Sequence, residues 1–93
     1  MGDPTQNPAF TDKQGQYLAF IHAYTLVMDQ PPAEADMQRF FAVSPPTVHQ
    51  MILTLEQKRL ITRKPGVPRS VALLINPESL PKLQPVKNSV QRY

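Results

Sequence analysis

Two pairs of adjacent prolines, Pro31-Pro32 and Pro45-Pro46, divide this 93-residue chain more sharply than any other feature. The residue before a proline is driven out of the helical region of backbone space, so a helix in the first third of the chain has to end before residue 31. A proline in the first turn of a helix is harmless, because the N–H groups there have no partner within the helix. The pairs therefore predict one helix that ends before residue 31 and another that begins at residue 45.

The segment 12–30 carries apolar residues at helical spacing. Thr11 and Gln14 occupy the positions of a capping box, in which each side chain accepts a hydrogen bond from the other residue's backbone N–H. Gly15 weakens the first turn by roughly 1 kcal/mol relative to alanine, and the apolar stripe is expected to outweigh that loss. The stripe is predicted to comprise Tyr17, Leu18, Ile21, Tyr24, Thr25 and Met28.

A second helix is predicted between the two proline pairs, from Ala33 to Phe41. Its apolar residues follow the i, i+4, i+7, i+8 pattern of a buried stripe. Glu34 places a negative charge in the first turn, where the helix dipole favours it. We expect the aromatic side chains of the first two helices to form the core rather than a surface for stacking bases. These are Phe10, Tyr17, Phe20, Tyr24, Phe40 and Phe41.

The third helix is predicted to begin after Ser44, a residue type whose side chain caps helix N-termini, with Pro45 at the first helical position. At about 100° per residue, one face is apolar and comprises Val48, Met51, Ile52 and Leu55. The opposite face and its flanks comprise Pro46, Thr47, His49, Gln50, Leu53, Thr54 and Gln57. This outward face is polar but almost without charge, whereas a helix face that only keeps a protein soluble usually carries Glu and Lys.

Residues 60–75 predict a β-hairpin. Leu60–Arg63 leads into Pro65-Gly66, a pair typical of type II turns, and Arg69–Ile75 alternates on the way out.

The rest of the chain is expected to lie outside this domain. A flexible arm is predicted over residues 1–10, a folded domain over residues 11–75, and a proline-rich basic tail over residues 76–93. The tail is expected to be extended or disordered, with Leu80 and Leu83 packing back on the domain.

Positive charge is concentrated in the second part of the chain. Residues 1–36 hold one lysine against five carboxylates, a net charge of −4, whereas residues 37–93 hold nine Lys or Arg against two carboxylates, a net charge of +7. Such a division is typical of a protein that turns one face toward a polyanion, although a solvated basic face has the same pattern. The cations at the hairpin could also protect an edge strand against aggregation.

Three helices followed by a two-stranded hairpin describe a winged helix-turn-helix, a mainly α fold of the α+β class. An exposed helix fits the major groove of DNA, where Gln and Thr can distinguish base edges, and neighbouring cations can hold phosphates. The cations predicted to bind phosphates are Lys58, Arg59, Arg63, Lys64 and Arg69. Further candidate contacts to DNA or to a partner protein are Leu53, Thr54 and Gln57.

From Phe10 to Ile75 the chain resembles the N-terminal DNA-binding domain of the LexA repressor family. The corresponding pieces, in the family's order, are "FTDKQGQYLAFIHAY", "PPAEADMQRF", "SPPTVHQMILTLEQKRLI" and "KPGVPRSVAL". Two positions depart from the family, because Asp36 replaces an apolar residue and Phe41 replaces a glycine. The resemblance implies base contacts from the first two turns of the third helix, at Ser44, Pro46, Thr47, His49 and Gln50. It does not extend to the family's self-cleaving, dimerising C-terminal domain.

The leading hypothesis is a sequence-specific, double-stranded DNA-binding protein, a small prokaryotic transcription regulator of the repressor type. Two alternatives stay open: a winged-helix adaptor that binds proteins, and a nonspecific or accessory DNA binder of a mobile element. The oligomeric state is also open, and one form it could take is a homodimer that assembles only on DNA.

Several other classes of function are not expected. Ser44 and Ser70 have no base and orienting acid near them in the predicted fold, and three glycines make no phosphate-binding loop, so we expect no enzyme. Without cysteines, the distant His22 and His49 do not suggest a metal site, and no cofactor or small-molecule ligand is expected. No segment is apolar for long enough to span a membrane, so the protein is expected in the cytoplasm, on the nucleoid when bound to DNA.

Overall fold

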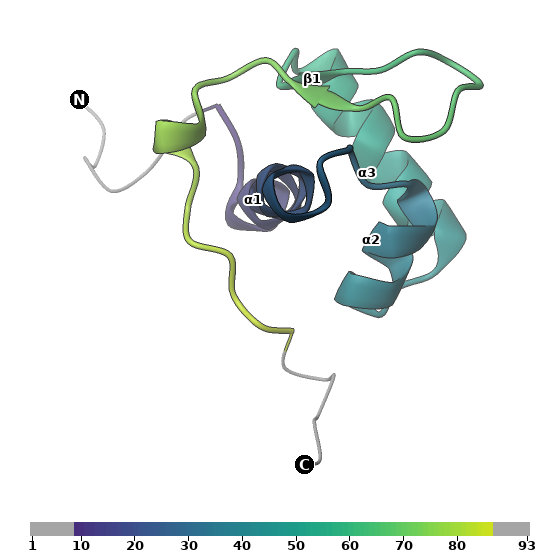
Figure 1. The fold of residues 1–93 in the computed structure, drawn as a ribbon, viewed down its shortest axis with the longest axis horizontal. Coiled ribbons are helices and arrows are strands. Elements are labelled where there is room, and N and C mark those ends of the chain that lie inside the picture. Colours follow the sequence, from purple (N-terminus) through teal and green to yellow (C-terminus); the bar gives the residue numbers. More distant parts are fainter. Residues whose placement is uncertain (1–8, 87–93) are drawn as a thin grey trace.

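The computed structural model describes residues 9–86, which form three α-helices, a two-stranded sheet and one short 3-10 helix (Figure 1). The elements in chain order are α1 (Asp12–Met28), α2 (Glu34–Phe41), α3 (Pro45–Gln57), β1 (Ile61–Thr62), β2 (Ala72–Leu73) and η1 (Pro77–Ser79). Seen end-on in Figure 1, α1 lies between α2 and α3 on one side and the chain that follows β2 on the other. This arrangement confirms the predicted winged helix-turn-helix fold.

Helix α1 begins and ends at local signals in the sequence and backbone. The Thr11 Oγ1 atom accepts from the Gln14 backbone N–H at 3.1 Å, and the Thr11 N–H donates to Gln14 Oε1 at 3.0 Å, which confirms the predicted capping box. The helix ends where Asp29 takes a left-handed backbone conformation (φ 60°). The prediction that Met28 is buried was wrong, because the buried residues of α1 lie between residues 15 and 21 and the last turn is left exposed.

The core is built around stacked aromatic rings from α1 and α2. The Tyr17 ring stacks on Phe41 with 4.0 Å between ring centroids, and the Phe20 ring stacks on Phe40 at 4.8 Å. The predicted inner face of α3 completes the core with Val48, Ile52 and Leu55, whereas Met51 is only half-buried. The aromatic residues are therefore core residues, as predicted, and Phe41 fills the core where the resembled family favours glycine.

The turn between α2 and α3 depends on backbone conformation rather than on a side-chain cap. Ala42 ends α2 in the left-handed region (φ 56°), which is strained for any residue with a Cβ. Ser44 is the N-cap of α3, but its hydroxyl makes no bond to the backbone, which corrects the prediction. The reason is that Pro46 has no N–H to offer, and the N–H of Thr47 already donates to the Ser44 carbonyl at 3.1 Å.

The wing, residues 60–75, is a hairpin with a short ladder. Ile61 pairs with Leu73 and Thr62 with Ala72, so the predicted strands over 60–63 and 69–75 were too long. The turn has the predicted type II features, since Gly66 has a positive φ of 76° and the Val67 N–H donates to the Lys64 carbonyl at 3.0 Å.

Two features of the outgoing side of the wing stop the ladder early. Ser70 Oγ accepts from the Lys64 N–H at 2.9 Å and donates to the Val67 carbonyl at 2.8 Å, which closes the loop on itself. Arg69 is left-handed (φ 56°), which takes the chain out of the extended conformation that a strand needs.

The strap, residues 76–86, returns along α1. Gln16 Nε2 donates to the Lys82 carbonyl at 3.0 Å, and Gln16 Oε1 accepts from the Gln84 N–H at 2.8 Å. Apolar side chains of the strap pack against the core, as predicted for the first two of them: Leu80, Leu83 and Val86. The remaining parts of the predicted arm and tail, residues 1–8 and 87–93, lie outside the described residues.

Candidate nucleic-acid interface

The outward face of α3 offers polar side chains to solvent. Its exposed residues are Pro46, Thr47, His49, Gln50 and Gln57, while Leu53 and Thr54 are half-buried. The opposite face is held in the core by Val48 and Leu55, which have no exposed surface. The side-chain amide of Gln50 makes no hydrogen bond to any residue between 9 and 86, so its donor and acceptor groups are free to meet a ligand.

Hydroxyl groups on the same helix are partly occupied. Ser44 Oγ and Thr47 Oγ1 lie 2.9 Å apart and share one hydrogen bond at the start of α3. Thr54 Oγ1 donates to the Gln50 carbonyl at 3.0 Å, so its proton is committed to its own helix. The hydroxyl groups of α3 are therefore partly engaged, whereas the Gln50 amide is not.

His49 has a carboxylate neighbour from α2. Its Nδ1 atom lies 3.3 Å from Glu34 Oε2, and both side chains remain in contact with solvent. This contact turns the imidazole toward the start of α2 and places a negative charge beside one edge of the outward face.

The five cations predicted to bind phosphates fall into two groups. Two are paired with carboxylates, since Arg63 Nε lies 3.1 Å from Glu56 Oε1 and Arg69 Nη1 lies 3.0 Å from Asp36 Oδ2. Among residues 9–86, the Lys58 ammonium donates only to the neutral amide of Gln14, at 2.8 Å. Arg59 and Lys64 make no ion pair within the described part of the chain. Uncompensated positive charge therefore remains on three of the five: Lys58, Arg59 and Lys64.

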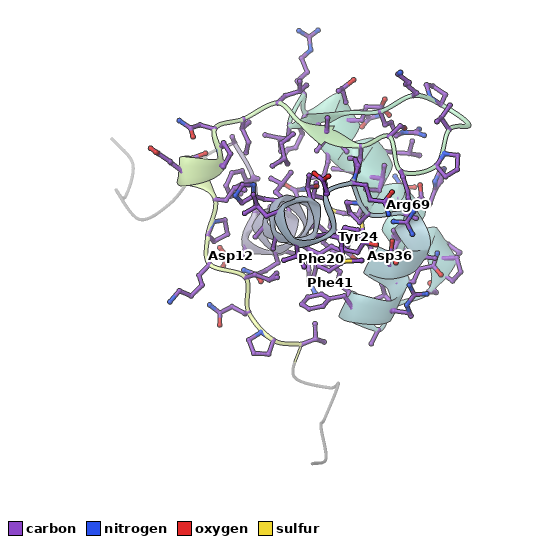
Figure 2. The ribbon with its side chains drawn as sticks, viewed as in Figure 1. Asp12, Phe20, Tyr24, Asp36, Phe41 and Arg69 are labelled. Carbon is purple, nitrogen blue, oxygen red and sulfur yellow. The ribbon has the colours of Figure 1, made fainter. Side chains whose placement is uncertain are left out.

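Asp36 is the residue that sequence reasoning missed. Its side chain is only 8% exposed, and its carboxylate contacts the Ala33 N–H, Arg39 and Arg69 as well as the Tyr24 hydroxyl. Figure 2 shows Tyr24, Asp36 and Arg69 gathered beside the end of α1, although they come from α1, α2 and the wing. The departure of this position from the apolar pattern of the resembled family was the available signal.

Neighbouring groups shift the pKa values of both Asp36 and Arg69. Burial favours the neutral form of Asp36, but the Ala33 N–H, the Arg69 charge, the Tyr24 hydroxyl and the Arg39 charge together outweigh it and lower the pKa of the carboxyl. The pKa of Arg69 is raised, first by its hydrogen bond to Tyr24 and further by the Asp36 carboxylate, against a smaller desolvation effect. The pair is therefore fully ionised at neutral pH.

A hollow of about 410 Å³ lies between α2, α3 and the wing. Its lining includes His49 and Ile52 from α3, Pro68 from the wing loop, and both paired arginines, Arg63 and Arg69. The wing loop, residues 64–68, thus faces the helices across this hollow.

In the described part of the chain, no three His, Cys, Asp or Glu side chains gather in a group that could hold a metal ion. Between residues 9 and 86, no helix is long and apolar enough to cross a membrane.

A core-anchored helix with a free polar face, preceded across a tight turn by a second helix and followed by a β-hairpin, defines a winged helix-turn-helix domain. The chain belongs to the LexA DNA binding domain family, whose model matches residues 7–70. It is 35% identical to the LexA repressor of Thermosipho melanesiensis over 80 residues. These residues are 86% of this chain and 39% of that protein. It is 34% identical to the LexA repressor of Thermosipho africanus over 70 residues, and these residues are 75% of this chain and 35% of that protein. The chain thus spans about two fifths of the length of these relatives.

Proposed function

We propose that this chain is a sequence-specific, double-stranded DNA-binding protein that acts as a small transcription regulator of the repressor type. The observation that carries the proposal is the free amide of Gln50 on the exposed face of α3, because a glutamine can make two hydrogen bonds to the major-groove edge of adenine. Membership of the LexA DNA binding domain family supports DNA as the ligand. Such a regulator would act in the cytoplasm, where the nucleoid lies.

In this proposal α3 enters the major groove with its first two turns. Thr47, His49 and Gln50 read bases, while Ser44 and Pro46 lie close to the same groove. Phosphates beside the groove are held by the uncompensated cations Lys58, Arg59 and Lys64. A homodimer on DNA would place two copies on paired half-sites, about one helical turn apart or a multiple of it.

Random-site selection with the purified chain tests the proposal. We expect one enriched motif, and a motif of two symmetric halves would mean that two copies bind. A pool that stays unenriched while binding is retained would instead favour a nonspecific or accessory DNA binder.

Gln50→Ala tests base reading at a single position. We expect a loss of roughly 1–3 kcal/mol on the selected motif and little change on mixed-sequence DNA, because only the base contact is removed. Gln30→Ala is the control, since Gln30 is also an exposed glutamine but lies between α1 and α2. Equal losses for Gln50→Ala on both DNAs would count against base reading.

An adaptor that binds proteins remains the second candidate, because one observation favours it. Leu26, Val27 and Met28 form an exposed apolar end of α1, with 71%, 80% and 51% of their surfaces accessible. Titration with mixed-sequence duplex at low salt separates the two candidates, since an adaptor would show no salt-dependent binding.

A further inference from the structure

Arg69 joins the wing to the elbow between α1 and α2. Its Nη1 atom donates to the Tyr24 hydroxyl at 2.9 Å and to the Pro31 carbonyl at 3.2 Å, and it lies 3.0 Å from Asp36 Oδ2. Its guanidinium also lies 5.8 Å from the centre of the Tyr24 ring, within reach of a cation–π contact. One side chain of the wing therefore contacts α1, α2 and the segment between them.

The Asp36 carboxylate, which pairs with Arg69, is fixed in place by two other hydrogen bonds. Asp36 Oδ2 accepts from the Ala33 N–H at 2.8 Å at the start of α2, and Asp36 Oδ1 accepts from Arg39 Nη2 at 2.6 Å. Asp36 cannot follow a displaced Arg69 without giving up the backbone N–H that begins its helix. The carboxylate is thus a rigid anchor for the wing.

Apart from Arg69, the wing is held at its base, where Leu60, Ile61 and Val71 are buried in the core and Arg63 is paired with Glu56 of α3, whereas its loop has little support. Its ladder contains two residue pairs, the loop residues 64–68 are exposed, and the hollow of about 410 Å³ lies between them and the helices. A two-stranded hairpin of this size is marginally stable on its own. The orientation of the loop relative to α3 therefore depends on the residues at the base of the wing, of which Arg69 makes the most polar contacts to the helices and the segment between them.

We propose that the Asp36–Arg69 pair is a clamp that sets the position of the wing relative to α3, and that Arg69 is a positioning residue for DNA binding rather than a phosphate ligand. The DNA part of this inference rests on the proposed function, whereas the position of the wing does not. The two roles of Arg69 predict opposite signs for one substitution. If Arg69 binds a phosphate, Asp36→Asn frees its charge and strengthens DNA binding. If Arg69 is part of a clamp, Asp36→Asn releases the wing and weakens DNA binding.

The first experiment measures the wing without DNA. Because the chain has no cysteine, spin labels can be placed at cysteines that replace the exposed Lys13 on α1 and Val67 at the wing tip. We expect a narrow distance distribution in the parent and a broad one in Asp36→Asn and Arg69→Gln. Arg39→Gln is the matched control, because Arg39 is the other cationic partner of Asp36 but does not belong to the wing. The distance distribution of this variant should stay narrow.

Thermal unfolding of each labelled variant shows whether it is folded at the temperature of the measurement. If Asp36→Asn does not fold, Tyr24→Phe takes its place, because it removes only the hydroxyl that Arg69 contacts and keeps the ring. Folded Arg69→Gln and Tyr24→Phe chains with distributions as narrow as the parent's would overturn the clamp.

The second experiment measures DNA affinity against salt concentration. We expect Asp36→Asn and Arg69→Gln each to weaken binding about tenfold, and the double variant to lose about tenfold rather than a hundredfold, because contacting residues that act as one unit are not additive. The slope of the salt dependence should not change in Arg69→Gln. A slope reduced by about 0.9 would show instead that Arg69 binds a phosphate. If the parent binds no duplex, the proposed function fails, and the distance measurement still decides whether the clamp exists.

Discussion

The salt dependence of DNA binding measures how many cations of this domain meet phosphates. Each neutralised phosphate contributes about −0.9 to the slope of log affinity against log salt concentration. Five phosphate-binding cations would give a slope of about −4.5. Arg63 and Arg69 are paired with carboxylates, so only Lys58, Arg59 and Lys64 are left. We therefore expect a slope of about −2.7 for one bound copy.

Fluorescence anisotropy with a labelled mixed-sequence duplex, short enough for one copy, is a suitable assay. Lys64→Gln should reduce the slope to about −1.8, because it removes one phosphate contact. Lys82→Gln is the control, since Lys82 is an exposed lysine of the strap and should not affect the slope.

Two results would refute this reasoning. A parent slope near −4.5 would mean that Arg63 and Arg69 leave their carboxylates when DNA binds. A slope that Lys64→Gln leaves unchanged would mean that the wing loop does not touch the DNA.

Three predictions concern stability. Gly15→Ala should lower the unfolding free energy in urea by about 1 kcal/mol, because its Cβ would lie 2.9 Å from Phe10 Cε1 and 3.0 Å from Pro81 Cγ; a gain in stability would show that helix propensity dominates. The lowered pKa of Asp36 means that its stabilising effect is complete above the ordinary carboxyl value of 3.8 and is lost as the pH falls through the lower native value. Asp36→Asn should therefore flatten the acid side of a plot of melting temperature against pH, and an unchanged acid side would contradict this. Ala42→Gly should raise the unfolding free energy by about 0.5 kcal/mol, because relief of the left-handed strain exceeds the entropy cost of glycine; a loss in chemical denaturation would argue that the position is unstrained.

The helices could be predicted closely because their signals are local. The capping box at Thr11 and the prolines around residues 31 and 45 act within one or two residues, so the predicted and observed ends nearly coincide. The strands could not be bounded in this way. Their ladder is cut short by the left-handed Arg69 and the bonds of Ser70, and neither feature follows from an alternating pattern.

The candidate site could be predicted in part for a related reason. The face of α3 follows from helical geometry, so the exposure of Gln50 was predictable. The state of the cations was not, because Arg69 is neutralised by a carboxylate far away in the sequence, and a count of charges does not show which ones pair. Only the three-dimensional arrangement therefore separates the three uncompensated cations from the two that are paired with carboxylates.

The short ladder of the wing has a consequence for how such a domain can change. Residues 64–68 contribute nothing to the buried core, and the chain enters and leaves this loop at Arg63 and Arg69, which are each secured by an ion pair. Loops of other lengths and charges can therefore be grafted between these two arginines without refolding the rest. On the proposed function, the share of phosphate binding that belongs to this loop is separate from the base-reading face of α3, so protein engineers could adjust the two one at a time.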